Sequence, residues 1–157
     1  MKLFSSDLIQ DIRIQDFMTP NPICLKSLDS LQHAAQIFSE YKIDAAPVVD
    51  AETNKLLGIF TKSNLFSAIS KKVDLDFPVE QFMERIVHTI HMESSLEEAA
   101  QIAWTHRVGR LPVVNNMNHV IGMWTQANLV SAYRKKTDEM INHFEAILRS
   151  VNCGVVA

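Results

Sequence analysis

The stretch Ala46-Pro47-Val48-Val49 has a counterpart later in the chain, Leu111-Pro112-Val113-Val114, which lies 65 residues further on. The same offset relates the Ala-Ala-Gln-Ile segments at 34–37 and 99–102, and an offset of 64 relates the segments at 58–68 and 122–132. The single lost residue falls between the last two predicted strands, where a turn tolerates it. So many ordered matches indicate that the chain contains two tandem copies of one repeat.

Each copy is predicted to run strand, helix, strand, strand, helix. The first long helix begins near Ser30 and carries its apolar residues on one face: Leu31, Ala34, Ala35 and Phe38. In the second copy, Ser94 and Glu97 have the spacing of a capping box before the matching helix. The Pro-Val-Val stretch predicts a short apolar strand, and the turn-rich segment 50–54 and the β-rich run 56–60 complete a hairpin.

The sequence therefore predicts an α/β (α+β) fold of two tandem repeats. A small sheet with helices on one side leaves its other face uncovered. Two such repeats, packed sheet to sheet with pseudo-two-fold symmetry, would bury both faces. The 157 residues, 47% of them apolar, are enough for a core of this kind.

The composition excludes several classes of function. A net charge of −3 gives no general basic field for nucleic acid or an anionic membrane, and no apolar run approaches the roughly 18 residues of a membrane span. Cys24 and Cys153 lie far apart and suggest neither a disulfide framework nor a metal site, so we expect reduced thiols in a cytoplasmic protein. We find no catalytic arrangement that predicts an enzyme, and expect no metal and no catalytic cofactor.

The two ends carry further patterns. Segment 1–13 is expected to hold a short amphipathic N-terminal helix. From Thr137 the pattern predicts a helix whose apolar residues have coiled-coil spacing, namely Ile141, Phe144, Leu148 and Val151; docking of this helix on its own domain is the alternative. Segment 152–157 is expected to leave the helix and begin a strand.

The two copies together resemble the CBS domain, the cystathionine-β-synthase type repeat, whose tandem pair is called a Bateman module. The resemblance is carried in each copy by a Phe-Met pair, by the Pro-Val-Val strand and by a Gly-to-Leu segment: Phe17-Met18, Pro47-Val48-Val49 and 58–65, then Phe82-Met83, Pro112-Val113-Val114 and 122–129. It places the first repeat at 14–72 and the second at 79–136, followed by a linker segment at 137–157.

The resemblance implies a regulatory module that binds AMP, ADP, ATP or S-adenosylmethionine in the cleft between repeats and changes the activity of an attached domain. It also implies a homodimer. Segment 144–157 is similar to the start of a PAS domain, so we expect an N-terminal sensory part of a longer bacterial signalling or transcriptional regulator. A dimerisation scaffold that binds no small ligand is the alternative function.

The resemblance implies three pieces of a ligand site in each repeat. The first strand contributes at Cys24 and Thr89, where the family pattern has Thr. The segments before the Pro-Val-Val strands approach the base with their backbones: Ala45-Ala46-Pro47 and Arg110-Leu111-Pro112. The third piece is a Thr-x-x-Asp pattern in which Thr and the helix N-terminus favour phosphate and Asp binds ribose. It falls here on Thr61 with Asn64, and on Thr125 with Asn128.

Both repeats thus carry Asn where the family pattern has Asp. Asn offers one carbonyl acceptor, without charge assistance, so we expect a weaker ribose contact at Asn64 and Asn128; a simple early-helix role is the alternative. Arg107, in a His-Arg stretch, resembles the phosphate-binding residues of some members, and its planar fork suits phosphate. The alternative is that Arg107 and Arg110 are solvated charges at a helix end.

Overall fold

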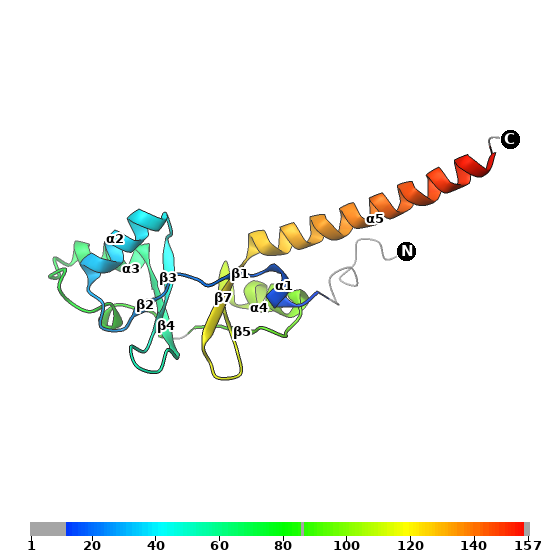
Figure 1. Ribbon diagram of the computed structural model, residues 1–157. Coiled ribbons are helices and arrows are strands. Elements are labelled where there is room, and N and C mark those ends of the chain that lie inside the picture. The colour runs from blue at the N-terminus through cyan, green and yellow to red at the C-terminus, as the bar shows by residue number, and fades with distance from the viewer. Residues whose placement is uncertain (1–11, 86, 156–157) are drawn as a thin grey trace.

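The computed structural model describes residues 12–85 and 87–155, with side chains up to Ser150 (Figure 1). Two lobes lie side by side, and one long helix projects from the second lobe. The elements are α1 (Ile14–Phe17), β1 (Thr19–Pro20), β2 (Leu25–Lys26), α2 (Leu31–Tyr41), β3 (Ala45–Val49), β4 (Leu56–Thr61), α3 (Lys62–Ser70), η2 (Val79–Gln81), β5 (Ile90–His91), α4 (Leu96–His106), β6 (Arg110–Val114), β7 (Val120–Thr125) and α5 (Gln126–Val155).

Each lobe contains one sheet with the topology that the repeat predicts. In the first, β2 runs parallel to β3 and β3 runs antiparallel to β4; in the second, β5, β6 and β7 have the same relations. The second sheet has one more strand, because β1 pairs with β7. The predicted order of strand, helix, strand, strand, helix is therefore confirmed in both repeats, from β2 to α3 and from β5 to α5.

Alternate residues of the central strands face two different environments. Val48 and Phe60 belong to the apolar core of the first lobe, and Val113 and Trp124 belong to that of the second. Pro47 and Pro112 are also fully buried and alternate with these core residues along their strands. Since neighbouring residues of a strand point to opposite faces, these prolines lie on the faces where the two sheets meet, which agrees with the predicted sheet-to-sheet packing.

The segments that precede each repeat are exchanged between the lobes. Ile12 and Ile14 are buried in the core of the second lobe, whereas Val79 and Met83 are buried in the core of the first. The sequence boundaries at 14–72 and 79–136 do not reveal this exchange, because an apolar leader segment does not indicate which of two similar cores it joins. Each lobe is therefore completed by residues that belong, in the sequence, to the other repeat.

The structure corrects three predicted boundaries. α5 continues as one helix from Gln126 to Val155, so no separate helix begins at Thr137 and no strand begins at 152–155. The predicted N-terminal helix lies outside the described residues up to position 11, and its last two residues, Ile12 and Arg13, are not helical. α4 is capped one residue later than predicted, because the side chain of Ser95 accepts from the Glu98 amide.

A glycine-to-alanine pair tests the exchanged packing. A Cβ on Gly58 would lie 2.5 Å from the backbone oxygen of Glu84, which the exchanged leader fixes in place, whereas a Cβ on Gly109 would meet nothing within 4 Å. We expect Gly58→Ala to lower the free energy of unfolding by roughly 1–3 kcal/mol in urea denaturation, and Gly109→Ala to change it by less than about 0.5 kcal/mol. Equal stability of the two variants would contradict this packing.

Candidate functional site

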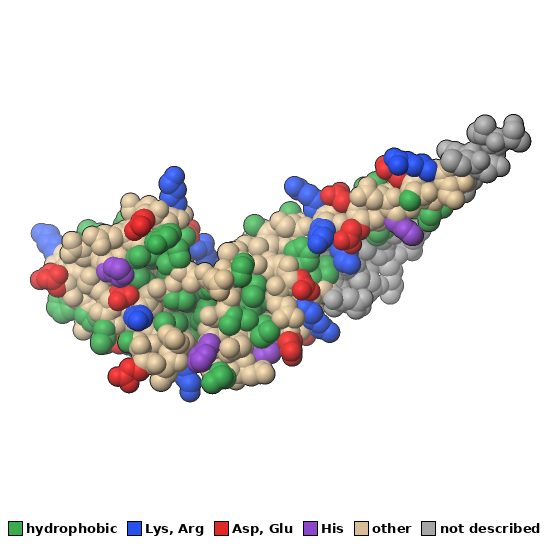
Figure 2. Space-filling view, in the orientation of Figure 1, with side chains coloured by type: hydrophobic (Ala, Val, Ile, Leu, Met, Phe, Trp, Pro, Cys, Tyr) green, Lys and Arg blue, Asp and Glu red, His purple; other side chains and the backbone are tan. Residues whose placement is uncertain are grey.

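A cleft of about 440 Å³ lies between the two repeats, where the surface in Figure 2 is hollowed between the lobes. The first repeat contributes the connection at 21–23, the segment before β3 and the inward residue Pro47; the second contributes residues of β6 and β7. Its walls combine apolar side chains, among them Ile23 and Met123, with polar ones, among them Thr19 and Asn21. This mixture is typical of pockets that hold a flat apolar group and fix it with a few polar contacts.

The cleft brings together four of the predicted site residues: Ala45 and Pro47 from the first repeat, and Arg110 and Thr125 from the second. Arg110 pairs with Thr125 in the register of β6 and β7, as Ala45 pairs with Thr61 in that of β3 and β4. Arg110 and Ala45 are therefore equivalent positions of the duplication. One cleft wall carries a guanidinium where the other carries only a methyl group.

An ion pair crosses the cleft between the two repeats. The guanidinium of Arg110 donates to both carboxylate oxygens of Asp44, with Nη1–Oδ1 at 2.5 Å and Nη2–Oδ2 at 3.3 Å. This hydrogen bond lowers the pKa of Asp44, and Lys62 lowers it further by its charge. The Asp44 side chain is 60% exposed, so the pair is at the cleft mouth and is screened by solvent.

Asn64 and Asn128 lie in the first turns of α3 and α5 and hydrogen-bond back to the residue before each helix. The Oδ1 atom of Asn64 accepts from the backbone and the hydroxyl of Thr61, at 2.8 and 2.9 Å, and Thr61 Oγ1 accepts from the Asn64 amide. Asn128 Oδ1 accepts in the same way from Thr125, at 2.7 and 3.2 Å. The amide oxygens that a ribose hydroxyl would use are thus engaged, which favours the early-helix role and leaves the NH₂ groups as donors.

Arg107 is placed apart from the cleft. It is the left-handed C-cap of α4, is exposed, and lines a second hollow of about 760 Å³ with Trp104 and Gln126. The predicted grouping of Arg107 with Arg110 and Thr125 is therefore split between two hollows, and only the last two residues line the cleft between the repeats.

The remaining predicted residues do not line the cleft. Ala46, Leu111 and Pro112 are buried, and Thr61 and Thr89 are half-buried. Cys24 is half-buried beside Pro22, with its Sγ 3.6 Å from the Pro22 oxygen, and burial raises the pKa of its thiol. Phe60 and Trp124, which would close the cleft if they pointed into it, are buried inside their own cores.

Sequence reasoning missed several cleft residues. Thr19, Asn21 and Asp44 line it, although none of them is among the predicted site residues. Asp44 could have been predicted as a cleft residue, because it comes directly before the predicted site segment Ala45-Ala46-Pro47. Its partner Arg110 lies 66 residues away, however, and no local pattern connects the two.

Among the described side chains, no group of three or more His, Cys, Asp and Glu is arranged to hold a metal ion. The helices that the structure describes include none whose length and apolar content would allow it to cross a membrane. Charged side chains of both signs are spread over the two lobes and along α5 on the face drawn in Figure 2.

The chain belongs to the CBS domain family, because the family model matches residues 14–71 and 79–135. The fold is that of solved CBS domain pairs. The CBS domain pair of protein MJ0100, solved with 5'-methylthioadenosine and S-adenosyl-L-methionine, is 27% identical with a TM-score of 0.69, and the match covers 79% of this chain and 97% of that one. CBSX2, solved with AMP, is 28% identical with a TM-score of 0.69, over 78% and 96%.

A curated relative is longer than this chain. The uncharacterized protein MJ1232 of Methanocaldococcus jannaschii is 30% identical over 131 residues, which are 83% of this chain and 41% of that protein. The chain therefore spans less than half the length of this relative.

The ion pair predicts a pH dependence of stability. A carboxyl group whose pKa is lower in the folded chain than in the unfolded one stabilises the fold above its unfolded pKa of about 3.9, and this contribution is lost as the pH falls through the folded pKa. In urea unfolding between about pH 3 and pH 7, Asp44→Asn should lose less stability on the acid side than the parent protein. Glu40→Gln, on the exposed end of α2, is the control. Parallel pH profiles of Asp44→Asn and the parent would contradict the prediction.

Proposed function

We propose that this chain is a regulatory module that binds an adenosine-type ligand in the cleft between its repeats and passes a conformational change to a domain joined to α5. The observation that carries the proposal is a cleft walled by both repeats, of a volume within the range of small-molecule sites. Related CBS pairs were solved with AMP and with S-adenosyl-L-methionine. Ile23 and Met123 provide apolar surface for a base, and Arg110 provides a charge for an anionic group.

A ligand that contacts both repeats can shift their relative arrangement only if it binds one arrangement better than another. The two cores are separate clusters, so such a shift does not require either core to be repacked. α5 begins at Gln126, directly after the cleft residue Thr125. A helix of 30 residues is about 45 Å long, so a small rotation at the cleft would become a large displacement at its far end.

The attached domain and its role in signalling or transcriptional control belong to this proposal. The likeness of segment 144–157 to the start of a PAS domain is one support, and the greater length of MJ1232 is another. The proposed role of the module is regulation, because the cleft residues supply binding groups and we assign no catalytic step to them.

A thermal-shift titration with AMP, ADP, ATP and S-adenosylmethionine tests ligand binding. A ligand that binds only the folded state at about 100 times its Kd should raise the Tm by about 5–10 °C. Ala45→Leu should abolish the shift, because its larger side chain fills the cleft, and Ala127→Leu on the exposed first turn of α5 should retain it. If no ligand raised the Tm at millimolar concentration, the binding function would be wrong.

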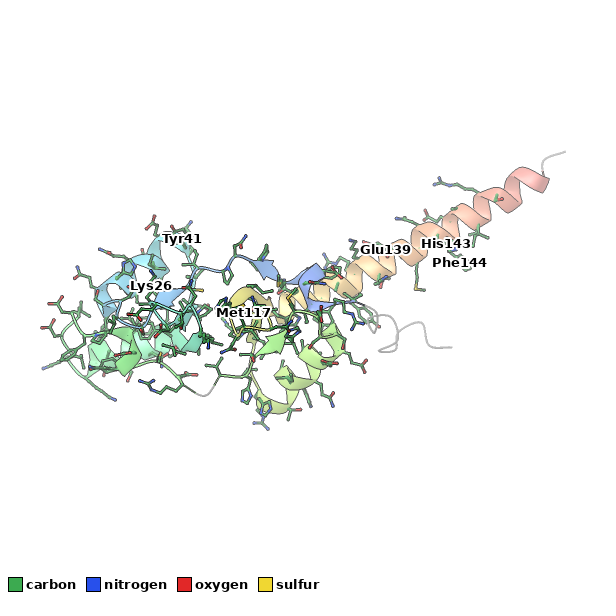
Figure 3. The ribbon with its side chains drawn as sticks, turned by 60° about the horizontal axis from the view of Figure 1, so that its bottom comes forward. Lys26, Tyr41, Met117, Glu139, His143 and Phe144 are labelled. Carbon is green, nitrogen blue, oxygen red and sulfur yellow. The ribbon has the colours of Figure 1, made fainter. Side chains whose placement is uncertain are left out.

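Homodimerisation is a second proposal, favoured by the surface of α5. Apolar residues recur at three- and four-residue spacing in the distal half of this helix and are exposed: Met140, Ile141, Phe144, Ile147 and Leu148. Figure 3 shows that Glu139, His143 and Phe144 extend from the part of α5 that projects beyond the lobes. Such a stripe on a helix is suited to pairing with the same stripe of a second copy.

Light scattering after size exclusion tests this pairing. We expect the parent protein to have the mass of a dimer, and Phe144→Glu to have that of a monomer, because it places a charge in the apolar stripe. Ala146→Glu, on the exposed polar side of the same helical turn, should leave the dimer intact. A monomeric parent, or a dimer that persists in Phe144→Glu, would refute pairing through α5.

A further inference from the structure

The ion pair between Asp44 and Arg110 breaks the symmetry of the duplication at the mouth of the cleft. The equivalent positions are Asp44-Ala45 in the first repeat and Gly109-Arg110 in the second. The first repeat carries the acid and the second carries the base, and the two side chains meet across the cleft. The pair is therefore a feature of this sequence that the repeat pattern does not supply.

The carboxylate of Asp44 binds the guanidinium Nη atoms of Arg110, which are the donors that an anionic ligand would also bind. Both of its oxygens accept from the two Nη atoms of Arg110, and a phosphate would bind a guanidinium through the same planar fork. A carboxylate and a phosphate cannot both hold this fork in the bidentate arrangement. A phosphorylated ligand in the cleft must therefore displace Asp44 or accept a poorer contact.

The backbone keeps Asp44 at this position. Its carbonyl oxygen accepts from the Lys62 amide at 2.9 Å, where α3 begins, so the acid is held beside the cleft whether or not its side chain is paired. The only charged side chains that line the described cleft are those of Lys42, Asp44 and Arg110. Removal of the acid would leave two cations facing the ligand.

We propose that Asp44 is a specificity-determining residue of the cleft, which lowers its affinity for ligands that carry a phosphate relative to uncharged nucleosides by occupying Arg110. This inference rests on the proposed function, because it assumes that the cleft binds an adenosine-type ligand. Asp44 contacts the group that would bind the phosphate, and it leaves the apolar walls around the base unchanged.

Calorimetric titration with AMP and with adenosine tests the inference, because the two ligands differ only in the phosphate. Asp44→Asn should bind AMP about two- to fivefold more tightly than the parent protein, in the range of an exposed ion pair, and should bind adenosine as the parent does. Glu40→Gln removes the same charge from α2 outside the cleft lining and should bind both ligands as the parent does. Asp44→Asn keeps the backbone contact with Lys62, so this variant should fold. A Tm close to that of the parent protein checks this.

A double-variant cycle separates occupation of Arg110 from general repulsion of the phosphate. If Asp44 acts through Arg110, then Asp44→Asn should give no gain in AMP affinity when Arg110→Gln is already present. A gain that persists in that background would overturn the occupation of Arg110 as the cause. Equal AMP affinity in Asp44→Asn and the parent, with adenosine bound by both, would overturn this inference alone; failure of every variant to bind either ligand would overturn the proposed function as well.

Discussion

The fold depends on the exchange of leader segments between the two repeats. The first amide of α2, on Leu31, donates to the carbonyl of Phe77, and the equivalent amide of α4, on Leu96, donates to that of Ile12. Helix N-termini leave amides without partners inside the helix, and here each repeat satisfies one with the chain that leads into the other. Since the apolar leader residues also enter the opposite core, neither repeat is complete alone, and the cleft between them has a defined geometry.

The contacts that hold the fold together are separate from those at the cleft mouth. The leaders and the cores tie the repeats together at their edges, whereas the cleft between them is bordered by a solvent-exposed ion pair and by partly exposed side chains. Exposed ion pairs contribute little to stability, so the contacts at the cleft mouth can change without loss of the fold. A regulatory module needs this combination, because a ligand can bias only those contacts whose free energy is comparable to its own differential affinity.

The features that depend on residues close together in the sequence could be predicted from it. The duplication, the Pro-Val-Val strands and the start of α2 at Ser30 followed from periodicity and capping residues, and the structure agrees with them. The ligand site was only partly predictable: Ala45, Pro47, Arg110 and Thr125 meet, while Arg107 lies elsewhere. The exchange of leaders and the pairing of Asp44 depend on residues far apart in the sequence. The strand predicted to begin in segment 152–157 is wrong for the described residues 152–155, because α5 continues to Val155.

The duplication also explains which features of the site are shared by the repeats and which are not. Asn64 and Asn128 perform the same capping in both copies, so a substitution at either would weaken a helix start whatever it did to a ligand. Asp44 and Arg110 have no such counterparts, because their equivalents are Gly109 and Ala45. The two walls of the cleft therefore carry opposite charges at these positions, the acid on the first repeat and the base on the second.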